Sequence, residues 1–480
     1  MMRVLYSKIL PINAGFEMSN RVIHLILGPL IYILCYYAVP LDVFGSYEAN
    51  GAVGCILWMA LWWIFVPVDL AVTAFIPIGV NALFCLMDMK DLIANYSSET
   101  ILLLLGASII TASWEITGLD RRVAARLLSF VGGNLRTQII VWFLLSAVLS
   151  SVLPNAVVCA AIIPIAVAQL KFSGFKDISS SRQASLVLLS IVYGAGVGGL
   201  ATPLGGAMNL VTVKYIEQIT GSEYMYAQWL KNLLPVFSVI LVSNIIYMVL
   251  QCKKTDSLGN TKEYFKEEFK KLDAMSVQEK WALLLFIAAA GLSFLRPLYQ
   301  GYLPGLKPAY VFIITAIIAF VISTKGGHRL LTWKSTQQKI VWELIFVFSG
   351  GIAVGTLFNS TGAALAIGQH FSCMQVQSDY LLVLMILVFT IILSDVTSNT
   401  ATAAISIPLV IALAEGLNKD PLVYIYVASI GVNLSYMLHT SIRAIPVGYG
   451  LKPKFMFNTG FLITLMTIIL SSFVGYYMVS

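Results

Sequence analysis

The stretch SDVTSNTATAAISIP, residues 394–408, decides the fold of this chain. Seven of its first nine residues are polar or ionisable, although apolar sequence lies on both sides. Ser, Thr and Asn side chains compete with a helical backbone for hydrogen bonds. The stretch therefore predicts a break in a long apolar helix. Such a break frees carbonyl groups that suit a cation and N–H groups that suit an anion.

The surrounding composition is that of a membrane protein. Of 480 residues, 59% are hydrophobic and 11% charged, and the mean hydropathy is +0.86. A soluble chain this apolar could not cover its surface with polar groups. Apolar blocks such as residues 309–322 and 460–479 predict spanning helices, because lipid offers the backbone no hydrogen-bond partner. The net charge of +7 gathers in loops, which the positive-inside rule places in the cytoplasm. We expect a multi-pass protein of the inner or plasma membrane, surrounded by lipid and without a nucleic-acid partner.

The two halves of the chain resemble each other. GASIITASWEITG at residues 106–118 aligns with GGIAVGTLFNSTG at 350–362, an offset of 244 positions. The same offset carries Asn155 to Asn399 and Pro164 to Pro408. We infer an internal duplication, expect the copies to be inverted, and expect the substrate at their interface near the bilayer midplane. The Thr-Gly pairs within the aligned segments predict re-entrant hairpins.

The first half has its own irregular segments. SSVLPNAVVCAAIIP, residues 150–164, places Pro154 before Asn155, and proline disrupts the helix around it. A kinked helix with a hydrogen-bonded Asn155 is the alternative, but the match to Asn399 favours a functional break. GVGGLATPLGGAMN, residues 196–209, predicts unwound or closely approached backbone. It is not a nucleotide-binding loop, because neither a βαβ pattern nor a Walker lysine accompanies it.

Arg443 is the most informative single residue. It lies within HTSIRAIPVGYG, residues 439–450, where an arginine at the bilayer centre costs about 2.5–3.5 kcal/mol. It must therefore face protein, water or a ligand. Its guanidinium matches a carboxylate bidentately, so it contacts either a substrate or the carboxylate of Asp395. Asp395 in turn is a cation ligand, a proton carrier or the partner of Arg443.

The Ser398-Asn399-Thr400 stretch followed by ATAAISIP resembles the C-terminal signature of the divalent anion–sodium symporter family. The resemblance extends over nearly the whole chain past the first spans. It implies an all-α polytopic fold of two inverted repeats with re-entrant hairpins, broken helices and about eleven spans. It also implies a homodimer in which an elevator-type transport domain moves against a scaffold. The expected regions are N-terminal scaffold spans (1–96), first-repeat transport elements (97–252), a cytoplasmic linker (253–280), second scaffold spans (281–340), and second-repeat transport elements with the final span (341–480).

The residue patterns and the family resemblance together give the expected site residues. Substrate contacts fall on Asn155, Gly206, Asn399, Thr400 and Arg443. Cation contacts fall on Ser150, Asn155, Gly205, Ser394, Asp395, Ser398, Asn399 and Ser441. The chain departs from the family pattern, because it has Pro154-Asn155-Ala156 for the first signature and Ile442-Arg443-Ala444 where Thr-Pro-Pro is usual. A guanidinium repels a sodium ion nearby, so two-sodium coupling is not expected, and Arg443 is able to replace a sodium ion as the counter-charge of the substrate.

We therefore expect a secondary active transporter of small organic anions, most of all di- or tricarboxylates, by an elevator alternating-access mechanism. It works as a sodium-independent exchanger or couples to protons or a single cation, and it needs no other cofactor. The alternatives are a cation/proton antiporter, with Asp395 as its key group, or a carrier of an inorganic oxyanion such as sulfate or arsenite. We do not expect an enzyme, since the four histidines form no HExxH motif and no paired catalytic groups occur.

Overall fold

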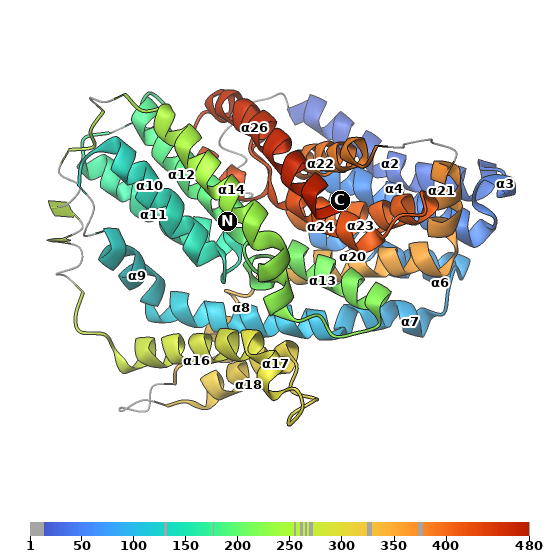
Figure 1. Ribbon diagram of the computed structural model, residues 1–480, viewed down its shortest axis with the longest axis horizontal. Coiled ribbons are helices and arrows are strands. Elements are labelled where there is room, and N and C mark those ends of the chain that lie inside the picture. Colours follow the sequence, from blue (N-terminus) through green and yellow to red (C-terminus); the bar gives the residue numbers. More distant parts are fainter. Residues whose placement is uncertain are drawn as a thin grey trace.

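The computed structural model describes residues 14–128, 132–175, 177–253, 256–259, 263–264, 266–267, 272–323, 329–372 and 378–479. In these ranges the chain is built from helices (Figure 1). Ten of them are long and apolar enough to cross a membrane, and four shorter apolar helices accompany them. The predicted all-α polytopic fold is confirmed.

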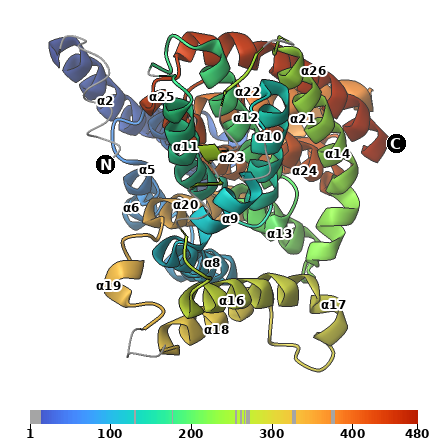
Figure 2. The same ribbon diagram turned by 90° about the vertical axis from the view of Figure 1, so that its left-hand side faces the viewer.

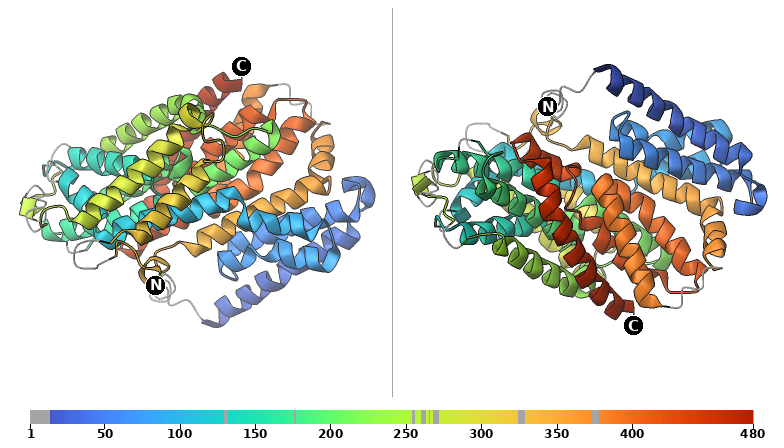
Figure 3. Two further views of the ribbon diagram at one scale, coloured as in Figure 1. Left: turned by 90° about the horizontal axis from the view of Figure 1, so that it is seen from below. Right: turned by 90° about the horizontal axis from the view of Figure 1, so that it is seen from above.

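The first half begins with short and long helices that lie together at one end of the molecule (Figure 3). These are α2 (Ala14–Ala38), α3 (Leu41–Phe44), α4 (Tyr47–Phe65), α5 (Leu70–Thr73), α6 (Ile76–Phe84), α7 (Met89–Ala94) and the 3-10 turn η1 (Asn95–Ser97). The elements that follow are α8 (Glu99–Thr117), α9 (Leu119–Leu128), α10 (Leu135–Ser150), α11 (Asn155–Phe172), α12 (Arg182–Gly199), η2 (Pro203–Gly205), α13 (Ala207–Thr220) and α14 (Tyr226–Leu250).

The second half starts with α16, whose first residue lies within the last four positions of the expected linker. Ser276 and Glu279 form a capping box there, which fixes the helix start. Its elements are α16 (Val277–Phe294), α17 (Arg296–Tyr299), α18 (Pro308–Val321), α19 (Trp333–Thr336), α20 (Trp342–Ser360), α21 (Ala363–Ser372), α22 (Asp379–Val396), α23 (Asn399–Gly416), α24 (Pro421–Asn433), η3 (Ser441–Arg443), α25 (Ala444–Gly448) and α26 (Pro453–Val479).

The duplication is visible in the helix boundaries. α11 and α23 each have 18 residues, and their first residues lie 244 positions apart (399 minus 155). α9 and α21 obey the same offset, as do the left-handed glycines before them, Gly118 at φ +80° and Gly362 at φ +82°. In Figure 1, α8 runs from α7 toward α9 on the left, whereas α20 runs toward α21 on the right. The copies are therefore inverted, as expected.

The two Thr-Gly turns are present, but the arms on either side of them are unequal. The arms before the turns, α8 and α20, have 19 residues each, which is enough to cross a membrane. The arms after the turns, α9 and α21, have ten residues each. The expected short arms are therefore found only after the turns, since α8 runs as one helix from Glu99 to Thr117.

Close helix packing holds the first break in place. α12 lies along α10, and a Cβ atom at Gly198 would come within 2.2 Å of the carbonyl oxygen of Ala147. Only glycine permits that approach. This close approach places the start of the Gly-rich turn beside the last turn of α10, directly before the break.

Candidate functional site

The second break lies between α22 and α23, where the sequence predicts it. α22 ends at Val396, and Ser398 caps α23 by accepting a hydrogen bond from the backbone N–H of Ala401 at 3.2 Å. The hydroxyls of Thr397 and Thr402 hydrogen-bond to each other at 2.6 Å. These side chains give the interrupted backbone local partners, which is why the break is stable inside apolar surroundings.

Asn399 and Ser394 form a buried polar cluster at this break. The Ser394 hydroxyl lies 2.8 Å from the carbonyl oxygen of Val432 and 3.1 Å from Oδ1 of Asn399. The hydroxyl of Ser435 lies 3.4 Å from the same Oδ1 atom. Asn399 and Thr400 are each 5% exposed, so this part of the expected site is closed to solvent in the structure.

Arg443 lies at the centre of the second break. Its guanidinium donates to the carbonyl oxygens of Leu438 (2.6 Å), Ser435 (3.0 Å) and Ser394 (3.2 Å). It also donates to the hydroxyls of Thr440 (2.7 Å) and Ser435. All five N–H groups are therefore used by protein oxygens, and the side chain is 1% exposed.

Asp395 is the charge partner of Arg443, with 3.7 Å between Oδ1 and Nη2 and each side chain 1% exposed. The same Oδ1 atom accepts hydrogen bonds from the backbone N–H groups of Met437 (2.9 Å) and Leu438 (3.3 Å). Of the two contacts left open for Arg443, the structure shows the ion pair with Asp395. The carbonyl oxygens at this position already accept hydrogen bonds from the guanidinium, whereas Oδ2 of Asp395 is buried without a hydrogen-bond partner among the described residues.

The first break spans four residues between α10 and α11. The hydroxyl of Thr202 donates to the carbonyl oxygen of Ser151, which the end of α10 leaves free. Asn155 is the first residue of α11 and is half-buried, and Pro154 before it provides no side-chain cap. Gly205 and Gly206 lie in the facing turn, where the backbone of Gly205 packs against that of Gly199. Ser441, in contrast, is exposed at the start of η3.

Two asparagines join the halves beside the first break. Nδ2 of Asn433 donates to Oδ1 of Asn209 at 2.8 Å, and Asn209 donates to the carbonyls of Gly199 (2.6 Å) and Thr202 (2.8 Å). The sequence analysis missed Asn433, and a polar residue ending an otherwise apolar helix was the available signal. Among the described residues, Oδ1 of Asn433 and the hydroxyl of Ser150 are buried without a hydrogen-bond partner. Buried oxygens without a partner are the kind of ligand that a hard cation takes.

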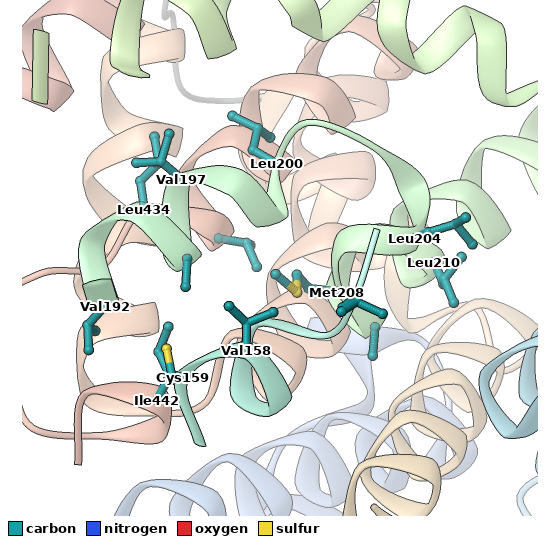
Figure 4. Packing of buried hydrophobic residues seen from close by; sticks show 14 of the residues in the cluster. Val158, Cys159, Val192, Val197, Leu200, Leu204, Met208, Leu210, Leu434 and Ile442 are labelled. Carbon is teal, nitrogen blue, oxygen red and sulfur yellow. The ribbon is translucent and has the colours of Figure 1, made fainter. Parts of the chain in front are cut away.

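Apolar side chains fill the space where the two repeats meet (Figure 4). Cys159 of α11 lies next to Ile442 of η3, and Val158 lies near Met208. Across the same region the hydroxyl of Tyr193 donates to the carbonyl of Tyr436 at 2.9 Å. Among the hydrogen bonds of the described residues, none joins Asn155 to Asn399 directly. The two breaks are thus held near one centre and separated by packed side chains.

Comparisons with known proteins agree with this architecture. The model of a family described as citrate transporters matches residues 60–431. The sodium-dependent dicarboxylate transporter SdcS of Staphylococcus saprophyticus is 26% identical over 96% of this chain and 92% of its own length. SdcS of Staphylococcus aureus strain RF122 is 26% identical over 97% of this chain and 92% of its own.

Solved structures share the fold at low sequence identity. The YdaH transporter of Alcanivorax borkumensis has a TM-score of 0.52 and 14% identity, covering 83% of this chain and 88% of its own. MtrF of Neisseria gonorrhoeae, from a class of antimetabolite efflux pumps, has a TM-score of 0.52 and 12% identity, covering 94% and 97%. The resemblance to the divalent anion–sodium symporters, the expectation of a plasma-membrane transporter and the expectation that it is not an enzyme are confirmed. The chain belongs to the citrate transporter family and is a multi-pass membrane transporter of bacterial type.

Proposed function

We propose that the chain carries a small dicarboxylate across the membrane, with Arg443 in place of one coupling cation. The observation that carries the proposal is the pair of matched breaks. α11 and α23 both begin with an asparagine at a helix N-terminus, where backbone N–H groups favour an anion. A dicarboxylate matches this arrangement, because it has one carboxylate for the N-terminus of each of the two helices. The relatives named as dicarboxylate transporters support the same cargo.

The substrate contacts belong to this proposal. Asn155, Gly206, Asn399 and Thr400 offer amide, backbone and hydroxyl groups to the carboxylates. Arg443 acts from behind them as a fixed positive charge and touches no substrate in the arrangement described above. The elevator motion and the homodimer implied by the family resemblance are part of the same proposal.

Two coupling modes follow from the same residues. A single sodium ion is supported by the unpaired oxygens of Ser150 and Asn433 and by the relatives' sodium dependence. Sodium-independent exchange is the second candidate. It is supported because side chains already donate hydrogen bonds to the carbonyl oxygens freed at both breaks: Thr202 to that of Ser151, and Arg443 to that of Ser394. In either mode a second sodium ion has no place at the α22–α23 break.

Reconstituted liposomes test the cargo. Liposomes preloaded with unlabelled succinate and placed in sodium buffer should take up labelled succinate, and Asn399→Ala should abolish that uptake. Asn359→Ala, which removes an exposed asparagine from the end of α20, is the matched control and should leave uptake unchanged. Uptake of sulfate or arsenite with none of succinate or citrate would transfer the proposal to an inorganic oxyanion. A pH-driven sodium flux without any anion would indicate an antiporter.

A further inference from the structure

A cavity of about 780 Å³ lies between α8, α9 and α11. Figure 2 views the molecule from the side on which these three helices lie, with α11 above α9 and α8. One wall is a face of α11 on which small side chains lie among larger apolar ones; the small ones are Ala156, Ala160, Ala161 and Ala168. Small residues at successive turns leave open the volume that larger side chains would fill.

The cavity connects the linker side with the first break. Tyr264 and Leu272, which follow α14 in the charged linker, line its outer end. Leu153 and Ala156, which flank Asn155, line its inner end together with Ile445 of α25. The linker carries many basic residues, so its side is the cytoplasmic one by the positive-inside rule. The cavity therefore leads from the cytoplasmic side to the place where the two halves meet.

An ion pair stands across this route. Glu115, in the last turn of α8, pairs with Lys339, in the loop before α20. Both residues line the large cavity, and both also line a smaller cavity that reaches Pro154 at the first break. The side chains are 44% and 41% exposed, so the pair is open to solvent and contributes little to stability.

We propose that this cavity is the access vestibule of the transport site, with a largely apolar wall, and that the Glu115–Lys339 pair is its latch. When an anion arrives, its carboxylate competes with Glu115 for the ammonium group of Lys339, and Lys339 becomes the first cation that the substrate meets. The inference rests on the proposed function for its cargo, but the vestibule itself is a property of the fold.

Cysteine labelling tests the vestibule without transport. Ala160→Cys lies on the cavity wall and is exposed, whereas Val148→Cys on α10 is 64% exposed outside the cavity lining. A charged, membrane-impermeant thiol reagent applied from the linker side should modify Ala160→Cys at least about tenfold faster than Val148→Cys, above the background of the parent chain. Equal rates, or modification of Ala160→Cys only from the opposite side, would overturn the vestibule. Rapid labelling in a protein that transports no succinate supports the vestibule and places the failure in the cargo.

Two charge-neutralising variants test the latch. Glu115→Gln and Lys339→Gln should both speed the labelling of Ala160→Cys several-fold, because each removes the pair. The two variants should change the KM for succinate in opposite directions. Glu115→Gln lowers the KM for succinate by leaving Lys339 free, whereas Lys339→Gln raises it, with little change in maximal rate. Unchanged labelling overturns the latch, and equal changes in KM overturn the role of Lys339 as an anion contact.

Discussion

Arg443 carries a positive charge into the second break, where α22 ends and its last carbonyls have no helical partner. The guanidinium donates to the carbonyl of Ser394 on one side and to those of Ser435 and Leu438 on the other. A sodium ion prefers such a set of oxygen atoms, so the arginine provides permanently what an ion would bring. Asp395 balances the charge, which keeps the buried pair neutral as a unit.

Breaking this pair should be costly. Arg443→Ala leaves Asp395 buried with a charge and no cation, which typically costs about 3–5 kcal/mol. We expect a large fall in the thermal midpoint of the purified protein in detergent. The double variant Arg443→Ala with Asp395→Ala should recover part of that loss, because the orphan charge is gone. Two independent, additive losses would show that the residues are not coupled.

If Arg443 acts as a fixed cation, its removal should create a binding site for sodium. In Arg443→Ala the carbonyls of Ser394, Ser435 and Leu438 and the nearby Oδ1 of Asn399 become available to an ion. Sodium, compared with potassium or choline, should then raise the melting midpoint of Arg443→Ala more than that of the unchanged protein. Arg443→Lys is the matched control and should resemble the unchanged protein, since its ammonium still excludes the ion. No difference between the variants in sodium would contradict the substitution of a side chain for an ion.

The sequence identified Arg443 but could not choose its partner. A guanidinium in apolar sequence requires neutralisation whether it meets a substrate or Asp395, so composition alone leaves both contacts open. The choice depends on which carbonyls the break between α22 and α23 turns inward, and this follows from three-dimensional packing. Asn433 was not predicted for a similar reason. Its contribution is a hydrogen bond to Asn209, and the two residues are distant in sequence.

At the scale of elements, the constant offset of 244 positions was the strongest information in the sequence. It predicted corresponding breaks, and α11 and α23 indeed begin at the corresponding asparagines. The lengths of the hairpin arms were harder to judge. The arm before the first turn is a full span, and Ser113 and Thr117 are tolerated inside it because they donate to carbonyls of their own helix.

The Gly-rich turn between α12 and α13 offers a test of close backbone approach. A Cβ atom at Gly205 would lie 2.3 Å from the carbonyl oxygen of Gly199, and backbone there cannot yield easily. Gly205→Ala should cost about 1–3 kcal/mol in the free energy of unfolding and impair uptake. Gly196→Ala is the control, since its Cβ would lie 3.9 Å from the nearest atom and alanine favours a helix. Equal stability of the two variants, measured by thermal melting, would refute the tight turn.

The whole molecule is two inverted copies with packed side chains between their breaks. Hydrogen bonds of Asn209 with Asn433 and of Tyr193 with Tyr436 join the two copies. Charged contacts hold the outer elements: Arg122 pairs with Glu279 at 2.6 Å on the linker side, and Arg296 pairs with Glu223 at 2.9 Å. Composition predicted the membrane fold and the repeat predicted the inversion. The differences between the two breaks required the structure. At the first break Thr202 donates to the free carbonyl oxygen of Ser151, and at the second the guanidinium of Arg443 donates to that of Ser394.

The central claim is that a side chain has replaced one coupling cation, and the sodium dependence of uptake tests it most directly. The initial rate of labelled succinate uptake into liposomes should be measured against external sodium, with choline holding the ionic strength. The account predicts that the rate rises no more steeply than first order in sodium, with a Hill coefficient of about 1 or no dependence at all. A sigmoidal dependence with a Hill coefficient of about 2 would mean that two sodium ions bind cooperatively, and it would contradict the assignment of Arg443.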